Sequence, residues 1–175
     1  MRKYLLLCIA AFLLRPTTAS AQYVAPADTI FPFNVTLVSP DSTVTTSSKT
    51  LLRKGEVTVL TFWLTTCYPC QIELDVYTRN YPVWKEQVDF RLIAISTDFP
   101  DRFRLIDKRI REKKYPFEVW WDRYRGFSQV LPGQLNGLPQ IFIFDKQGRL
   151  AWRHKGFYSG LEQEMMDQVV RLSQE

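Results

Sequence analysis

The period of the hydrophobic pattern changes several times along the chain, and each change predicts a different element. Residues 57–64 (Val-Thr-Val-Leu-Thr-Phe-Trp-Leu) and residues 88–96 consist mostly of β-branched, aromatic and aliphatic side chains, which is typical of inner strands buried on both faces. Over residues 67–80 the apolar positions recur at helical spacing, and Pro82 should end or bend that helix. Residues 100–113 show the same spacing with Arg and Lys between the apolar positions, which predicts a second, amphipathic helix.

Shorter patterns extend this core at both ends. Residues 33–38 alternate as a strand does, and residues 42–46 follow a turn and can return as its hairpin partner. The remaining expected elements are a strand at 117–121, a hairpin of 141–144 and 150–153 about the turn 145–148, and a terminal helix with Leu161, Met165, Val169 and Leu172 on one face. The segment Ser159–Glu162 has the spacing of a capping box before that helix. This order predicts an α/β fold with a mixed central β-sheet, helices on both faces and an N-terminal β-hairpin extension.

The composition is that of one globular domain. The chain has 175 residues, of which 46% are hydrophobic and 23% are charged. A chain of this length buries about 70% of the surface that it exposes when unfolded, so it can build a core without disulfide staples. These fractions exclude a disordered, collagen-like or coiled-coil chain. Three cysteines are too few for a small disulfide-rich domain.

The first 21 residues predict a signal peptide that is removed from the exported protein. An apolar run of 11 residues follows Arg2 and Lys3, and Ala19-Ser20-Ala21 supplies the small residues of a cleavage site. The run is shorter than a membrane span of about 20 residues, although retention as an anchor stays open. Cleavage would also remove Arg15, so three cations are lost and the net charge falls from +5 to +2. An interpretation as a nucleic-acid-binding protein then loses its basis.

Cys67-Tyr68-Pro69-Cys70 is the feature that carries chemistry. A C-x-x-C pair at the start of a helix places two sulfurs within one turn, close enough to bond. Free N–H groups and the positive end of the helix dipole face the first sulfur and stabilise its thiolate. The thiol pKa of the first cysteine in such motifs falls from about 8.5 to roughly 3.5–7. Cys67 is therefore the expected nucleophile, and Cys70 is the expected resolving thiol.

Three other uses of these cysteines fit the sequence less well. A structural disulfide that closes a four-residue loop removes little entropy from the unfolded chain. A zinc site needs about four ligands, and the mature chain offers two cysteines and the distant His154. A peroxide-reducing cysteine usually has a threonine three residues before it, where this chain has Leu64.

A strand, a C-x-x-C, a helix and a later Gly137-Leu138-Pro139 before another strand together resemble the thioredoxin superfamily. Within it, the chain is similar to the TlpA/ResA-like branch of exported thiol-disulfide oxidoreductases over roughly residues 30–175. Thr61–Cys70 stands where those proteins have a Phe-Trp strand end, and Phe144–Gly148 matches their late hairpin. With the signal peptide expected at 1–21, the chain then divides into a leader with a β-hairpin at 22–50 and a thioredoxin-like domain at 51–175.

The resemblance also assigns roles to residues near the cysteines. Pro139 would be a cis-proline that faces the active site, and the backbone of Leu138 would pair with an extended substrate segment. Glu73, three residues after Cys70, would be a partly buried acid that passes protons during exchange. An exposed glutamate in the first helical turn, favoured by the helix dipole, is the alternative for Glu73.

Trp63 and Tyr68 complete the residues expected at the site. Trp63 would pack beneath it in a structural or a functional role, and Tyr68 would line the substrate-binding surface. The chain departs from cytoplasmic thioredoxins at Thr61, where those proteins often have a buried aspartate, so Glu73 is the remaining candidate acid. Departures of this kind bear on redox potential and partner choice rather than on the type of reaction.

The function that the resemblance implies is thiol–disulfide exchange in the cell envelope or periplasm. The expected enzyme is a monomeric reductase of protein disulfides that takes electrons from another protein dithiol, with cytochrome c maturation as one use of the family. No cofactor, metal, nucleic acid or membrane is expected to take part after signal cleavage. Two alternatives stay open: a net disulfide oxidase or isomerase, and a thioredoxin-fold binding module with an inert disulfide.

Overall fold

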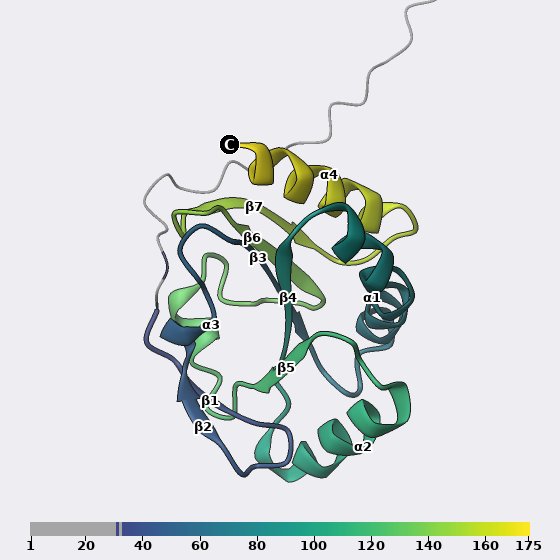
Figure 1. The fold of residues 1–175 in the computed structure, drawn as a ribbon. Coiled ribbons are helices and arrows are strands. Elements are labelled where there is room, and N and C mark those ends of the chain that lie inside the picture. The colour runs from purple at the N-terminus through teal and green to yellow at the C-terminus, as the bar shows by residue number, and fades with distance from the viewer. Residues whose placement is uncertain (1–30, 32) are drawn as a thin grey trace, which may run out of the picture.

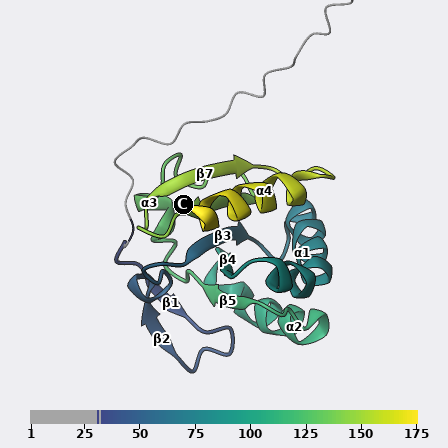
Figure 2. The ribbon, with the colours of Figure 1, turned by 45° about the horizontal axis from the view of Figure 1, so that its top comes forward.

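A seven-stranded mixed β-sheet forms the centre of the molecule (Figure 1). The computed structural model describes residue 31 and residues 33–175, so the expected signal peptide and residues 22–30 and 32 of the leader lie outside the described residues. The strands are β1 (Thr36–Val38), β2 (Thr45–Ser47), β3 (Val57–Trp63), β4 (Phe90–Ser96), β5 (Glu118–Trp121), β6 (Gln140–Phe144) and β7 (Leu150–Lys155). Their order across the sheet is β2-β1-β5-β4-β3-β6-β7. Figure 2 shows the sheet from β2 near the bottom of the view to β7 near the top.

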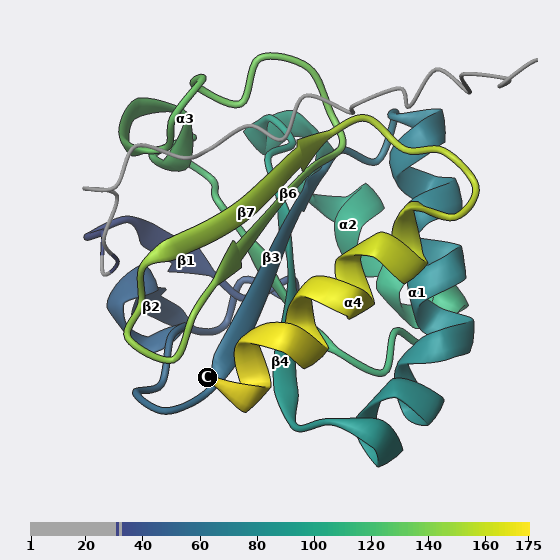
Figure 3. The same cartoon turned by 90° about the horizontal axis from the view of Figure 1, so that it is seen from above.

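The helices divide unevenly between the two faces of the sheet. They are α1 (Tyr68–Gln87), α2 (Phe103–Lys113), the short α3 (Phe127–Val130) and α4 (Leu161–Gln174), with single 3-10 turns at Ser48–Thr50 and Pro100–Arg102. Figure 3 shows α1, α2 and α4 on one side of the sheet and α3 on the other. The expected fold class is confirmed, including the N-terminal hairpin of β1 and β2. This hairpin joins the main sheet, because β1 pairs with β5 through Val38 and Trp121.

β3 is the central strand, and its composition explains its position. It pairs in parallel with β4 and antiparallel with β6, and all seven of its residues are buried. Its alternate residues contribute to two separate cores, Val59 and Trp63 beneath α1, α2 and α4, and Leu60 and Phe62 beneath α3. A strand buried on both faces needs apolar side chains at every position, which accounts for the uninterrupted hydrophobic run.

Pro82 does not end the first helix, contrary to one of the two expectations, because α1 continues to Gln87. Proline removes one backbone hydrogen bond and costs a helix about 3 kcal/mol. Two flanking aromatic residues offset that cost by packing: Trp84 is buried against Tyr77, and Tyr81 contacts the ring of Phe90. Each buried aromatic side chain contributes about 1.5–3 kcal/mol, so tertiary packing outweighs the local penalty.

The expected capping box before α4 does not form. Gly160, rather than Ser159, is the residue that caps the helix, and its φ of 100° lies in the left-handed region that glycine adopts without strain. Its N–H donates a hydrogen bond to Glu162 Oε2 at 3.0 Å. The chain therefore enters α4 through a sharp glycine turn. The four-residue helix α3 was also not expected, because its pattern is too short to give a periodic signal.

No helix among the described residues is long and apolar enough to cross a membrane.

Candidate functional site

The two cysteines lie where the central strand passes into the first helix. Cys67 is the capping residue of α1, and its Sγ accepts a hydrogen bond from the N–H of Cys70 at 3.3 Å. Pro69 occupies the first turn, where a missing N–H costs nothing. The expected start of the helix near Cys67 is therefore confirmed. The first sulfur thus lies at the N-terminal end of α1 and accepts a bond from one of its N–H groups, an arrangement that favours negative charge on it.

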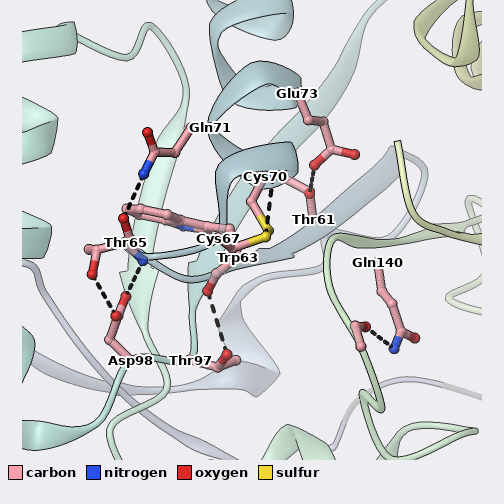
Figure 4. The surroundings of a disulfide bond; sticks show 11 residues. Thr61, Trp63, Thr65, Cys67, Cys70, Gln71, Glu73, Thr97, Asp98 and Gln140 are labelled. Carbon is pink, nitrogen blue, oxygen red and sulfur yellow. Dashed lines mark hydrogen bonds between the residues drawn. A yellow bond between two sulfur atoms is a disulfide. The ribbon is translucent and has the colours of Figure 1, made fainter. Parts of the chain in front are cut away.

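Cys67 and Cys70 are joined in a disulfide bond but differ in exposure (Figure 4). Cys67 is half-buried, whereas Cys70 is fully buried. Tyr68, between them in sequence, is 73% exposed and projects from the first turn of the helix. A reagent that approaches from solvent therefore reaches the sulfur of Cys67 before that of Cys70.

The loop that presents Cys67 is held by a buried carboxylate. Asp98 lies just beyond the end of β4 and is fully buried. Its Oδ2 accepts a hydrogen bond from the N–H of Thr65 at 2.9 Å, and its Oδ1 accepts one from the Thr65 hydroxyl at 2.7 Å (Figure 4). The Ser96 hydroxyl donates a further bond to Oδ2 at 2.8 Å. A carboxylate that accepts several hydrogen bonds restrains a loop strongly, because each hydrogen bond to a charged group contributes about 1.5–3 kcal/mol.

Two further bonds complete the restraint of this loop. The side-chain amide of Gln71 donates to the carbonyl of Thr65 at 2.6 Å, and the N–H of Thr97 donates to the carbonyl of Trp63 at 2.9 Å. None of Asp98, Gln71 and Thr97 was expected at the site from the sequence. A signal for Asp98 was present, because a polar residue just after a parallel strand lies at the edge where functional loops gather.

Glu73 is fully buried one turn after Cys70 in α1. The Thr61 hydroxyl of β3 donates a hydrogen bond to Glu73 Oε2 at 2.6 Å (Figure 4). Among the described residues, Glu73 Oε1 and the Tyr77 hydroxyl have no hydrogen-bond partner. The alternative of an exposed first-turn glutamate is excluded by this burial. Thr61, the position at which the chain departs from cytoplasmic thioredoxins, thus contacts Glu73, the acid expected from the resemblance.

Burial raises the pKa of Glu73 from 4.5 to about 8. The hydrogen bond from Thr61 and the nearby Tyr77 hydroxyl act in the opposite direction, because both favour the carboxylate, but they offset only part of the desolvation. Burial also raises the pKa of Tyr77, and the neighbouring Glu73 adds to that shift. A carboxyl group with a pKa near 8 holds its proton at pH 7 and can release it close to neutral pH.

The loop before β6 reaches the same end of the sheet as the cysteines. Gln140 of β6 pairs with Phe62 of β3, so Pro139 lies beside the end of the strand that leads to Cys67. The Leu138–Pro139 peptide bond is cis, as the resemblance implied, and Pro139 is buried while Leu138 is half-buried. The Pro139 carbonyl accepts a hydrogen bond from the N–H of Gly156 at 2.8 Å. The sheet register therefore brings together two segments that are about 70 residues apart in sequence.

Trp63 lies at the end of β3 and is fully buried beneath this site (Figure 4). Its ring meets that of Tyr115 edge to face, with centroids 6.3 Å apart. Its indole N–H has no hydrogen-bond partner among the described residues. All seven expected site residues thus lie at one end of the sheet, with Trp63 and Glu73 inside the molecule and Tyr68 on its surface.

Comparison with curated proteins relates this arrangement to known oxidoreductases. The chain is 29% identical over 103 residues to "Thiol-disulfide oxidoreductase ResA" of Bacillus thuringiensis subsp. konkukian, a match that covers 59% of this chain and 57% of that protein. It is 30% identical over 98 residues to the ResA protein of Geobacillus kaustophilus, covering 55% and 53% of the two chains. The chain thus spans little more than half the length of the curated relatives that it matches.

Solved structures extend the similarity to the whole fold. A thioredoxin-like protein from Porphyromonas gingivalis superimposes with a TM-score of 0.69 at 26% identity, covering 82% of this chain and 92% of that one. StoA from Bacillus subtilis, at 16% identity and a TM-score of 0.60, shares the fold over 81% of this chain and 99% of its own. The sequence profile of the AhpC/TSA family matches residues 28–153, which include the cysteine pair, the buried Glu73 and the cis-proline loop. With this profile covering most of its length, and with a thioredoxin-like fold around the disulfide, the chain belongs to the AhpC/TSA family.

Proposed function

We propose that the protein is a thiol-disulfide oxidoreductase that exchanges disulfides with protein substrates through Cys67 and Cys70. The observation that carries this proposal is the unequal exposure of two bonded sulfurs at a helix N-terminus, with Cys67 reachable and Cys70 buried behind it. The names of the curated relatives support the same activity. A disulfide that serves only as a staple gains nothing from this placement, because a four-residue loop removes little entropy.

The proposed reaction begins with both cysteines reduced. The Cys67 thiolate attacks one sulfur of a client disulfide, the client's second sulfur leaves as a thiolate, and a mixed disulfide forms. The Cys70 thiolate then attacks Cys67 Sγ, which releases the client as a dithiol and leaves the Cys67–Cys70 disulfide. Two electrons have passed to the client. A second protein dithiol, acting by the same two exchanges in reverse, returns the pair to its reduced form.

Glu73 is proposed to hold and release the proton of Cys70. The buried thiol must lose a proton before it can attack. Glu73, one helical turn away, takes that proton in its carboxylate form, which a pKa of about 8 makes accessible close to neutral pH. The proton returns when Cys70 is reduced again. Thr61 positions the acid through its hydrogen bond and does not itself take part in proton transfer.

Leu138, Pro139, Tyr68 and Trp63 are proposed to form the substrate side of the site. The backbone of Leu138 would pair with an extended client segment, and the exposed Tyr68 ring would pack against it. Trp63 would support the loop from below. The cellular setting that we propose is the cell envelope, with net reduction as the direction and cytochrome c maturation as one use; a signal peptide at 1–21 belongs to the same proposal.

Two cysteine variants test the activity. Cys67→Ser should abolish the acceleration of insulin reduction by dithiothreitol, whereas Cys70→Ser should retain attack and accumulate mixed disulfides with clients. These mixed disulfides are visible on non-reducing gels and identifiable by mass spectrometry. If both variants behave as the parent does, and the parent's disulfide resists dithiothreitol, the protein is a binding module with an inert bond. Faster oxidation than reduction of a model client would instead favour the oxidase or isomerase alternative.

A further inference from the structure

A pocket lies at the end of the sheet opposite the disulfide. This cavity of about 450 Å³ is formed by the segment before β3 and the turn between β6 and β7, and its walls include two apolar and four cationic residues: Phe31, Leu52, Lys49, Arg53, Lys54 and Lys146. β3 begins at Val57, just after this segment, whereas Cys67 follows its far end. Seven strand residues span roughly 20 Å, so a ligand in this pocket does not touch the sulfurs.

Backbone hydrogen bonds hold the walls of this pocket in place. The N–H of Phe31 donates to the carbonyl of Gly148 at 2.8 Å, and the N–H of Gly55 donates to the carbonyl of Lys146 at 2.9 Å. The N–H of Gly148 closes its own turn on the carbonyl of Asp145 at 2.9 Å. The cations therefore project from three segments whose backbones are held together by hydrogen bonds. A ligand would not lose binding free energy by ordering these segments.

The positive charge of the pocket is not neutralised by its surroundings. Within the described part of the chain, none of the ion pairs involves Lys49, Arg53 or Lys54. The acid of the β6–β7 turn, Asp145, is buried and bonded to Arg149 Nε at 2.7 Å. The half-buried Lys146 donates to the carbonyl of Ser173 at the end of α4, so three cations remain for a ligand.

A neighbouring hollow contains acids that limit how far the positively charged surface extends. It shares Arg53, Lys54 and Lys146 with the pocket and adds two acids, Glu56 and Asp89. Asp89 is bonded to Lys85, which leaves Glu56 as the acid facing the shared cations. The excess of positive charge is therefore concentrated on the side of Lys49 and Phe31, where none of the described residues of the wall is acidic.

We propose that this pocket binds a phosphate-bearing anion whose organic part packs on Leu52, the half-buried apolar side chain of its wall. A single carboxylate would leave two of the three cations unbalanced, whereas a phosphate monoester carries about −1.5 to −2 and three acceptor oxygens. The guanidinium of Arg53 can bind two of those oxygens at once, and Lys49 and Lys54 can approach as point charges. The cavity exceeds a bare phosphate and falls in the size range of small-molecule sites of about 300–1,000 Å³.

Two sources share this chemistry, a soluble phosphate ester and the headgroup of an anionic phospholipid, and two probes separate them. Phenyl phosphate is titrated into the ¹⁵N-labelled protein, with benzoate as the carboxylate comparison. Vesicles of phosphatidylcholine with and without phosphatidylglycerol are then co-sedimented with the protein. Phenyl phosphate should shift the amide signals of residues 49–54 and 146–148 more strongly than benzoate, or anionic vesicles should retain the protein where neutral vesicles do not.

A triple variant and a matched control decide whether the pocket is responsible. Lys49→Gln/Arg53→Gln/Lys54→Gln should weaken binding about a hundredfold, since each cation near an anionic surface strengthens binding several-fold. The control Arg104→Gln/Lys108→Gln/Arg111→Gln removes the same charge from the exposed face of α2 and should bind as the parent does. Both variants keep the same N-terminal residues as the parent, so any membrane affinity of that segment cancels.

Three results would overturn the proposal: neither probe binds, benzoate binds as well as phenyl phosphate, or both triple variants lose binding equally. The single variant Arg53→Gln, at an exposed position, serves if the triple variant does not fold, and it should weaken phosphate binding several-fold. Insulin reduction should be the same in parent and variants, because the pocket is far from the sulfurs. This outcome separates the binding proposal from the proposed oxidoreductase function, since either can fail without the other.

Discussion

The Thr61 hydroxyl donates a hydrogen bond to Glu73 Oε2 over 2.6 Å and thereby joins the central strand β3 to helix α1. Both residues are fully buried, and Glu73 lies one turn beyond the buried Cys70. The bond gives the carboxyl group one fixed partner inside an apolar core, and burial keeps the group protonated at neutral pH. An acid inside the molecule is costly for stability, and its position near the cysteine pair supports the chemical use that we propose for it.

Glu73→Gln should remove a pH dependence of stability. The folded-state pKa of about 8 exceeds the ordinary value of 4.5, so between these values the folded protein binds a proton that the unfolded chain does not. The parent therefore loses about 1.4 kcal/mol per pH unit as the pH rises through this window. Glutamine mimics the protonated acid and lacks that slope, so the variant should match the parent near pH 4 and exceed it at pH 8.

Urea unfolding of the oxidised protein from pH 4 to pH 9 measures this difference. Glu86→Gln, at an exposed position on the same helix, is the matched control and should follow the parent at every pH. Parallel curves for Glu73→Gln and the parent would contradict the assigned pKa. An unchanged pH profile of insulin reduction would separately remove the proposed role of Glu73 in proton transfer.

Thr61→Val should raise the pKa of Glu73 further. The hydrogen bond that is lost favours the carboxylate. Since such a bond contributes about 0.5–1.5 kcal/mol, its loss should raise the pKa of Glu73 by up to about 1. Carboxyl ¹³C chemical shifts of Glu73 report the midpoint. Thr58→Val is the control, because the Thr58 hydroxyl is buried in the same strand without a hydrogen-bond partner among the described residues. A midpoint that moves equally in both variants would argue against a specific Thr61 contact.

Asp98→Asn should loosen the loop before Cys67. The amide nitrogen of asparagine cannot accept, so at least one of the bonds from Thr65 is lost, at a cost of about 1–3 kcal/mol in unfolding free energy. Thiol–disulfide exchange should slow several-fold, because a displaced Cys67 sulfur is aligned less often with the disulfide that it attacks. Asp101→Asn, three residues later and exposed, should change neither quantity. Unchanged exchange in Asp98→Asn, despite lower stability, would restrict Asp98 to a structural role.

The thiol of Cys67 should titrate below the ordinary value of about 8.5, because helix N–H groups and the helix dipole favour its thiolate. The rate of iodoacetamide alkylation of the reduced protein, followed from pH 5 to pH 10, gives the midpoint. Mass spectrometry should locate the label on Cys67 before Cys70, as their exposures require. Equal labelling of both residues, or an alkaline midpoint together with slow exchange, would be incompatible with the proposed mechanism.

Much of the site was visible in the sequence because its first parts are neighbours along the chain. The β-branched run, the C-x-x-C and the change to helical period predicted that the cysteines stand between a strand and a helix, and β3 and α1 confirm this arrangement. Glu73 and Pro139 were found by resemblance and not by pattern, because one acid in a helix and one proline in a loop look like many others. The functional roles of these residues stay predictions.

Local patterns establish the elements and the position of the reactive pair, because backbone preferences and hydrophobic period act over a few residues. They do not establish which distant residues meet. Thr61 reaches Glu73, and Thr65 reaches Asp98 across 33 positions, through the pairing of β3 with β4 and the packing of α1 on the sheet. The same packing carries α1 past Pro82. These contacts depend on the free energy of burying side chains from several elements, which in total exceeds any single local conformational preference. The residues that contribute to it are scattered along the chain and do not form a motif.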